Sequence, residues 1–232
     1  MWTPTPYKIA FNANGGTDGW TRSLAYGSTL AAPTVTRLGY TFAGWSPAVP
    51  ATVPVGGGTY VAQWHPTTYT VAFNANGGKL PKGKKMAAQT MTYGTAAKLR
   101  KNVFTRSGWV FAGWATKKGG AVAYTDAQSA KNLRADGGTM TLYAVWAKKT
   151  YKVAFYANGG KGTMAVESFT YGKAKKLTAN KFKAPKGKKF AGWATSKANA
   201  KKGVVKYKNK QSVKNLVTTG KTVKLYAVWK KK

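Results

Sequence analysis

The amino-acid sequence predicts an α+β protein that is mostly β and consists of three small modules in tandem. Two observations support this prediction. Alternating apolar residues, which are typical of half-buried strands, recur along the chain. The same motifs also return three times in the same order, which indicates an internal repeat. Hydrophobic residues make up 43% of the 232 residues, enough for packed cores and too many for a wholly disordered chain.

Each module is delimited by the same landmarks. It opens with a strand-like run that starts at Tyr7, Tyr69 or Tyr151, and it passes through a glycine pair and an FAGW motif. It closes on an apolar strand that ends in Trp64, Trp146 or Trp229. These landmarks predict modules at 7–64, 69–146 and 151–229. The short joints between them, 65–68 and 147–150, are expected to leave the modules limited freedom.

Within a module, most of the chain is predicted to be strand. Tyr69, Val71 and Phe73 alternate with other residues and so share one face of a strand. The segments 125–133 and 208–216 are the better helix candidates, because Val213 and Leu216 are three residues apart. The first module has three prolines at 46–58 instead, so we expect a shortened module in which a Pro-rich segment replaces the helix.

The motif VAFNANGG at 71–78, repeated at 9–16 and 153–160 with small changes, raises the question of a phosphate-binding loop. A Walker-type loop needs two glycines that are separated by four residues and followed by Lys and then Ser or Thr, and the complete motif is absent. Asn followed by Gly tolerates positive φ and is typical of tight turns. The motif is therefore predicted to be a structural turn.

Small modules have marginal cores, and the absence of cysteine excludes disulfides as a support. Six of the nine tryptophans occupy two equivalent positions in the three modules. Each could bury about 200 Å². We therefore expect these aromatic side chains to form the cores and not a ligand platform.

The side chains needed for catalysis are few. The chain has one histidine and four carboxylates: His65, Asp18, Asp126, Asp136 and Glu167. They lie in different modules or at non-equivalent positions, so they assemble neither a nucleophile–base set nor a carboxylate cluster for a hard cation. The sequence predicts no catalytic, metal-binding or cofactor-binding residues, and we expect no enzyme.

In combination, FNANGG, GYTFAGW at 39–45 and the closing LYAVW resemble the Listeria–Bacteroides repeat, the B repeat of internalin-type bacterial surface proteins. The resemblance covers 7–229. It implies β-grasp-like modules, each a sheet with at most one short helix, displayed outside the cell or on its surface as stalk or adhesion segments. The chain departs from the pattern at one aromatic position: Tyr40 and Trp109 correspond to Lys188 in the third module.

Charge is the unusual feature of the composition. Lys and Arg number 39 against four acidic residues, which gives a net charge of +35. The first module has three basic residues and the second has twelve, whereas residues 151–232 contain 22. Such a chain attracts polyanions of many kinds. Most of the cations are Lys, which acts as a point charge with little geometric selectivity.

The predicted polyanion-binding residues are those of the lysine-rich clusters. They are Lys82, Lys84, Lys85, Lys98, Arg100, Lys101, Lys173, Lys175, Lys176, Lys186, Lys188, Lys189, Lys201, Lys202, Lys206, Lys208 and Lys210. The partners would be cell-wall polymers, sulfated glycans or the nucleic-acid backbone, bound without specificity. The sequence contains no RNP-like strand, zinc finger or basic helix that would indicate a nucleic-acid-binding module.

Three functional interpretations follow. The favoured one is a non-enzymatic surface repeat protein that serves as a stalk or adhesion segment, binds anionic polymers and self-associates along a filament. The alternatives are a nonspecific nucleic-acid-binding protein and an engineered, supercharged repeat scaffold. The sequence predicts neither a membrane span nor, within this chain, a signal peptide.

Overall fold

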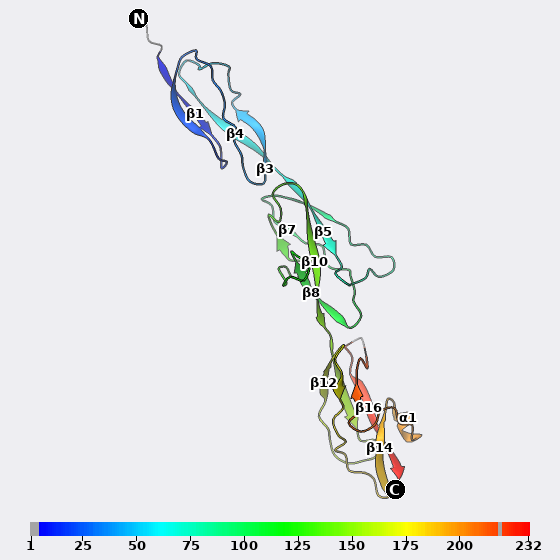
Figure 1. Ribbon diagram of the computed structural model, residues 1–232. Helices are drawn as coiled ribbons and strands as arrows, with labels where there is room; N and C mark the ends of the chain where they lie inside the picture. Colours follow the sequence, from blue (N-terminus) through cyan, green and yellow to red (C-terminus); the bar gives the residue numbers. More distant parts are fainter. Residues whose placement is uncertain (1–4, 218–219) are drawn as a thin grey trace. The chain divides into compact units, whose positions relative to one another are not determined.

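The computed structural model describes residues 5–217 and 220–232, and in this part of the chain nearly all regular structure is strand (Figure 1). The mostly β class predicted from the sequence is confirmed. The residues group into two compact units. Of the described residues, one unit holds those up to 76 with 85–102 and 114–144, and the other holds 77–84, 103–113 and those from 145 onward.

Three four-stranded sheets share one topology. The first contains β1 (Pro6–Asn12), β2 (Trp20–Ala25), β3 (Tyr40–Ser46) and β4 (Gly58–Pro66) in the order β2-β1-β4-β3. The second contains β5 (Thr68–Asn74), β6 (Gln89–Thr92), β8 (Trp109–Ala115) and β10 (Thr139–Lys148) in the order β6-β5-β10-β8. The third contains β11 (Thr150–Tyr156), β12 (Glu167–Thr170), β14 (Lys188–Ala194) and β16 (Val223–Lys231) in the order β12-β11-β16-β14.

In each sheet the opening and closing strands of the module lie side by side in the middle and run parallel. A short antiparallel strand flanks the opening strand. The strand carrying the FAGW motif flanks the closing strand, and in the first and third sheets a bulge interrupts the register before Gly44 and Gly192. The β-grasp-like character implied by the resemblance stays a prediction.

Two small ladders complete the second and third modules. They pair β7 (Ala97–Lys98) with β9 (Ser129–Ala130) and β13 (Lys175–Lys176) with β15 (Ser212–Val213). In the first module a single bridge between Thr29 and Thr52 takes their place. The first module, which has shorter loops, therefore has one bridge where the other two have a two-stranded ladder.

The predicted helices over 125–133 and 208–216 are wrong, because both segments contain a tight turn followed by β9 or β15. Ala127 and Lys210 adopt left-handed φ values of 55° and 57°, which a helix cannot contain. A glutamine side chain closes each turn. In the third module, for example, the Lys208 N–H donates to Gln211 Oε1 at 2.7 Å. The one helix in the described residues is α1 (Lys197–Lys201), whose first turn is capped by Ser196.

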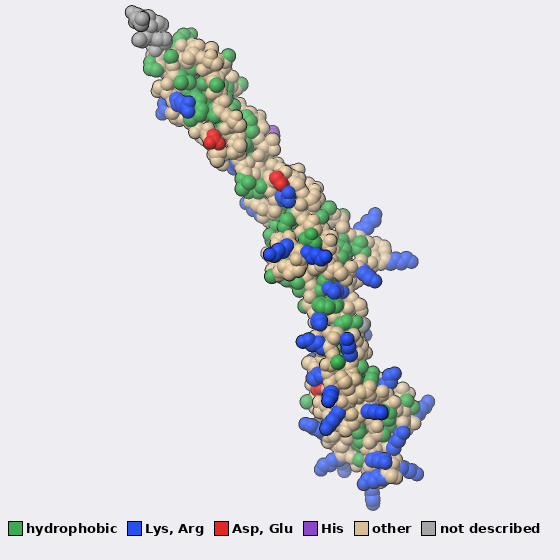
Figure 2. Space-filling model, in the orientation of Figure 1, with side chains coloured by type: hydrophobic (Ala, Val, Ile, Leu, Met, Phe, Trp, Pro, Cys, Tyr) green, Lys and Arg blue, Asp and Glu red, His purple; other side chains and the backbone are tan. Residues whose placement is uncertain are grey.

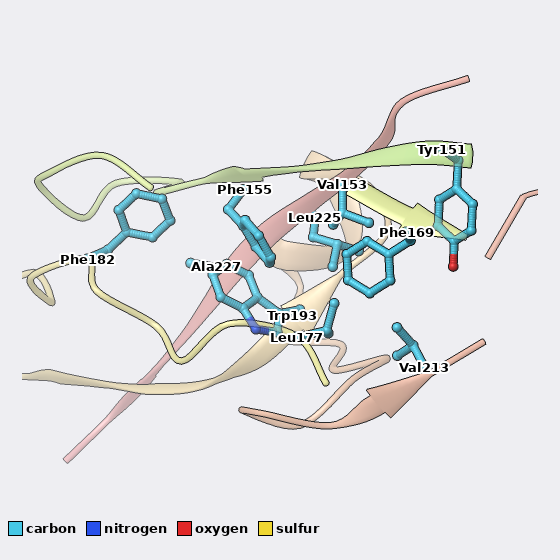
Figure 3. Close-up of a cluster of buried hydrophobic side chains, with 10 residues drawn as sticks. All are labelled: Tyr151, Val153, Phe155, Phe169, Leu177, Phe182, Trp193, Val213, Leu225 and Ala227. Carbon is cyan, nitrogen blue, oxygen red and sulfur yellow. The ribbon is translucent and has the colours of Figure 1, made fainter. Parts of the chain in front are cut away.

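The predicted aromatic cores are confirmed for the tryptophan of the FAGW motif in the second and third modules, whereas Trp45 of the first module packs against its core and is only half-buried. Trp114 and Trp193 are completely buried. Figure 3 shows Trp193 of β14 in the middle of the third core, facing Phe155 of β11 at a ring distance of 4.8 Å. The closing tryptophans Trp64, Trp146 and Trp229 are only half-buried.

The Asn-Gly-Gly motif is a turn, as predicted. Asn14, Asn76 and Asn158 have φ values of 48°, 44° and 46°. Their side-chain Nδ2 groups donate to the closing strand, at the carbonyl oxygens of Ala62, Ala144 and Ala227. The N–H of Gly16 is bound to the Ala13 carbonyl, and that of Gly160 to the Ala157 carbonyl. These N–H groups are therefore not available to a phosphate.

A corner of one module covers a tyrosine ring of the next. The corner spans residues 36–40 in the first module and 105–109 in the second. Gly39 lies against the ring of Tyr93, so closely that a Cβ would overlap it, and Gly108 meets Tyr171 in the same way. Each of these two contacts lies within one compact unit.

Backbone hydrogen bonds fix the joint residue on both sides. Thr67 N–H donates to the Gly39 carbonyl at 2.9 Å, and the Thr67 carbonyl accepts from Tyr93 N–H at 2.9 Å. Lys149 makes the equivalent bonds to Gly108 and Tyr171 at 2.9 and 2.8 Å. We call this arrangement of corner, joint residue and tyrosine ring the module joint.

Candidate anion-binding surface

Every predicted polyanion-binding residue has an exposed side chain, from Lys82 to Lys210. Figure 2 shows Lys and Arg side chains gathered over the third module, whereas the visible face of the first carries few. Within the described ranges there are two salt bridges, Arg134 with Asp136 and Lys175 with Glu167. Of the predicted set, Lys175 alone thus has a carboxylate partner within those ranges, and the positive charge of the others is uncompensated there.

The structure distributes these residues over several loops and gathers only some of them. Lys82, Lys84 and Lys85 belong to a loop of the second module. Lys98 lies on β7, and Lys175 and Lys176 form β13. Lys188 and Lys201 are different, because they line one open pocket of about 610 Å³ in the third module.

The pocket combines cations with aromatic surface. Its lining includes Lys188 at the start of β14, Lys197 and Lys201 on α1, and the rings of Tyr156 and Tyr226. Lys197 and Lys201 are four residues apart, so the helix places them on one side. The two rings stack at a centroid distance of 5.0 Å, and Tyr156 is 40% exposed.

The stacked tyrosines belong to the third module only. Tyr156 and Tyr226 are direct neighbours on the parallel strands β11 and β16. The equivalent neighbours are Asn12 with Val61 in the first sheet and Asn74 with Tyr143 in the second. The third module therefore has an aromatic pair where the others have at most one ring.

The sequence prediction missed Lys197 and the two tyrosines. Two signals could have found them: Ser196 is a typical helix N-cap before Lys-Ala-Asn-Ala-Lys, and Tyr156 replaces the Asn of the FNANGG motif. Neither signal shows that α1 lies beside the end of β16. That depends on the tertiary fold.

The acidic residues form no metal site in the part of the chain that the structure describes, since no three His, Cys, Asp or Glu side chains come together there. Hydrogen bonds from the Arg134 side chain hold the pKa of Asp136 below its usual range. Asp136 is thus engaged with a neighbouring cation. No helix among the described residues has the length and apolar character required to cross a membrane.

Comparison with known proteins identifies the three modules. The family model of the Listeria-Bacteroides repeat domain matches residues 7–53, 69–145 and 151–228. The chain belongs to the Listeria–Bacteroides repeat family. It contains three tandem repeats, as the sequence motifs predicted.

The chain is also similar to a longer protein. Over 175 residues it is 27% identical to the "Putative Gly-rich membrane protein" of Evansella cellulosilytica. The match covers 68% of this chain and 19% of that protein. The present three-repeat chain therefore spans about a fifth of the length of this relative.

The family match to the first Listeria–Bacteroides repeat ends at residue 53, before β4 (Gly58–Pro66). β4 nevertheless pairs with both β1 and β3. The first repeat thus completes the same four-stranded sheet as the other two, although its loops are shorter.

Proposed function

We propose that this chain is a non-enzymatic segment of a bacterial surface protein, in which three repeats act as a stalk or adhesion region and the lysine-rich repeats bind anionic polymers. The exposed and uncompensated lysines are the observation that carries the proposal. Family membership and the printed name of the relative, a membrane protein, support display at the cell surface. The repeats are taken to extend over 7–64, 69–146 and 151–229.

The attraction is electrostatic and therefore depends on salt. A polymer that carries many negative charges releases condensed counterions when lysines neutralise it, so its affinity falls steeply as salt rises. Lys makes point-charge contacts, whereas Arg makes the paired contacts that select one geometry. A lysine surface therefore favours a charged polymer over one particular small anion.

The pocket of the third repeat favours a glycan among these polymers. The stacked rings of Tyr156 and Tyr226 offer an apolar face next to Lys188, Lys197 and Lys201. Ligand pockets commonly combine aromatic walls with a few placed polar groups. An acidic or sulfated sugar carries both the ring face and the negative charge that such a lining accepts.

Salt elution of the full chain from heparin–agarose tests the proposal. The pocket variant Lys188→Gln/Lys197→Gln/Lys201→Gln is compared with Lys82→Gln/Lys84→Gln/Lys85→Gln, which removes the same charge from the second repeat. We expect the wild-type chain to bind at low salt and to elute last, the second-repeat variant next and the pocket variant first. Failure of the wild-type chain to bind heparin at low ionic strength would contradict polyanion binding.

Two other outcomes would change the assignment. Equal elution of the two variants would show that charge alone decides, which would exclude a role for the pocket. Stronger retention of the wild-type chain on single-stranded DNA than on heparin would favour the nucleic-acid alternative, because tyrosine rings also stack on bases.

A further inference from the structure

We propose that Tyr26, together with the backbone of Thr5, is an open docking face for the corner of another Listeria–Bacteroides repeat joined ahead of residue 6. The partner is a corner in which Gly precedes an aromatic residue, as in Gly39–Tyr40 and Gly108–Trp109. The inference rests on the two module joints and is independent of the proposed polymer binding.

The corresponding tyrosines of the other two repeats are covered. Tyr93 lies on Gly39, and Tyr171 lies on Gly108. Both glycines are buried, although they are in loops next to the end of their own sheet. In each joint, the corner of one repeat therefore packs on the tyrosine of the Tyr-Gly motif in the next repeat.

Among the residues that the structure describes, Tyr26 makes the same backbone contact as the other two tyrosines, but no glycine corner covers its ring. Its N–H donates to the Thr5 carbonyl at 3.1 Å, which matches the bonds of Tyr93 to Thr67 and of Tyr171 to Lys149. An edge contact with Tyr7, at a ring distance of 6.4 Å, holds the Tyr26 ring in place. The ring is nevertheless 51% exposed, whereas those of Tyr93 and Tyr171 are half-buried.

The occupied joints define what fits. The partner residue must be Gly, because a Cβ would overlap the tyrosine ring. In the first joint the following aromatic adds a ring contact, which places Tyr40 against Tyr93 at a centroid distance of 5.8 Å. An arginine supports that aromatic from behind: Arg37 lies over Tyr40 at 4.1 Å and Arg106 over Trp109 at 4.3 Å.

A second copy of this chain is the weaker candidate for the same face. Its corners at 36–40 and 105–109 already cover Tyr93 and Tyr171. The remaining corner, 184–188, has Lys188 in place of the aromatic and Pro185 in place of the arginine. In addition, Lys232 N–H bonds Gly187 and so takes the joint position that Thr5 holds in the first repeat. Lys232 of one chain and Thr5 of another therefore cannot both occupy this position.

Tyrosine nitration by tetranitromethane, read by mass spectrometry, tests the proposal on the full chain. We expect Tyr26 to react several-fold faster than Tyr93 and Tyr171. A second protein carries an added copy of residues 69–149 directly ahead of residue 6, so that the copied Lys149 replaces Thr5. In this protein we expect Tyr26 to slow to the rate of Tyr93.

The control is the same four-repeat chain with Trp109→Lys in the added copy only. Here Tyr26 should stay reactive, because the corner then resembles 184–188. An unchanged Tyr26 rate in the four-repeat chain would overturn the proposal. If that chain does not fold, Tyr40→Lys in the original chain decides: it must raise the Tyr93 rate and leave Tyr171 unchanged, and an unchanged Tyr93 rate would overturn the proposal as well.

Discussion

Gly39 and Gly187 occupy equivalent positions in the first and third repeats and have the same left-handed backbone, with φ values of 78° and 71°. Their surroundings differ. Gly39 lies against the ring of Tyr93, whereas no atom comes within 4 Å of a Cβ built on Gly187. The pair therefore separates the cost of the backbone from the cost of the contact.

Alanine substitution at these two glycines should give unequal losses of stability. Gly187→Ala meets only the strain of positive φ, which costs about 1 kcal/mol. Gly39→Ala carries the same strain and must also displace Tyr93, so we expect a loss of about 2–3 kcal/mol. Amide hydrogen exchange of β3 and β14, which reports the free energy of local opening, measures both. Equal losses would mean that the Tyr93 ring moves aside freely.

At the scale of elements, the turn after β5 shows how one side chain connects two strands. Asn76 has positive φ, and its Nδ2 donates to the Ala144 carbonyl of β10 at 2.8 Å. Its N–H in turn bonds the Asn74 side chain at 2.8 Å. The turn is thereby fixed to the strand that runs parallel to β5.

Replacing Asn76 by Gly and by Ala separates these contributions. Asn76→Gly keeps the backbone conformation but leaves the Ala144 carbonyl without this donor, which costs about 1–3 kcal/mol. Asn76→Ala adds the strain of positive φ, a further cost of about 1 kcal/mol. Urea unfolding followed by hydrogen exchange in β5 and β10 measures both. A smaller loss for Ala than for Gly would contradict the role of positive φ.

The sequence predicted the strands and the turns because their signals are local. Alternation at Tyr69, Val71 and Phe73 and the Asn-Gly pairs depend on neighbouring residues only. The predicted helix at 208–216 failed for a related reason. The three-residue spacing of Val213 and Leu216 is short evidence, and Gln211 and Lys210 close a turn instead.

The pocket and the joints could not be predicted in this way. Gly39 and Tyr93 are 54 positions apart, and their contact depends on how one repeat follows another. Lys188, Lys197 and Tyr226 meet only after β14, α1 and β16 are assembled. The sequence shows that Lys188 stands where Tyr40 and Trp109 stand in the other repeats, but it does not show that this position belongs to a module joint.

At the scale of the whole molecule, charge opposes folding while the cores favour it. The net charge of +35 is concentrated in residues 151–232, which contain 22 basic residues and one acidic residue. The core of that repeat keeps the same apolar pattern as the others. Repulsion among its lysines therefore acts on the surface of an ordinary core.

Salt should stabilise the third repeat more than the first. Raising NaCl from about 10 mM to about 1 M shortens the screening length from about 30 Å to about 3 Å. We expect hydrogen exchange to slow more in β11 and β16 than in β1 and β4. Sodium sulfate at equal ionic strength is the control. Sulfate stabilises every core because it is excluded from protein surfaces, so only an extra slowing confined to the third repeat would indicate anion binding beyond screening. An equal response of the first and third repeats would rule out the charge gradient as a determinant of stability.

Because Lys188 replaces the aromatic residue of the corner, the two ends of the three-repeat chain differ in their ability to form a module joint. Consider a duplicate of the second repeat inserted after residue 149. Its glycine–aromatic corner would face Tyr171 of the third repeat, and its own tyrosine would face the corner of the original second repeat. A duplicate of the third repeat would also contain the tyrosine, but its corner would have Lys in place of the aromatic residue. Duplication of the second repeat can thus add repeats in front of the third that carry both halves of a module joint. Repeats added behind the third would follow a corner that has Lys188 in place of the aromatic residue.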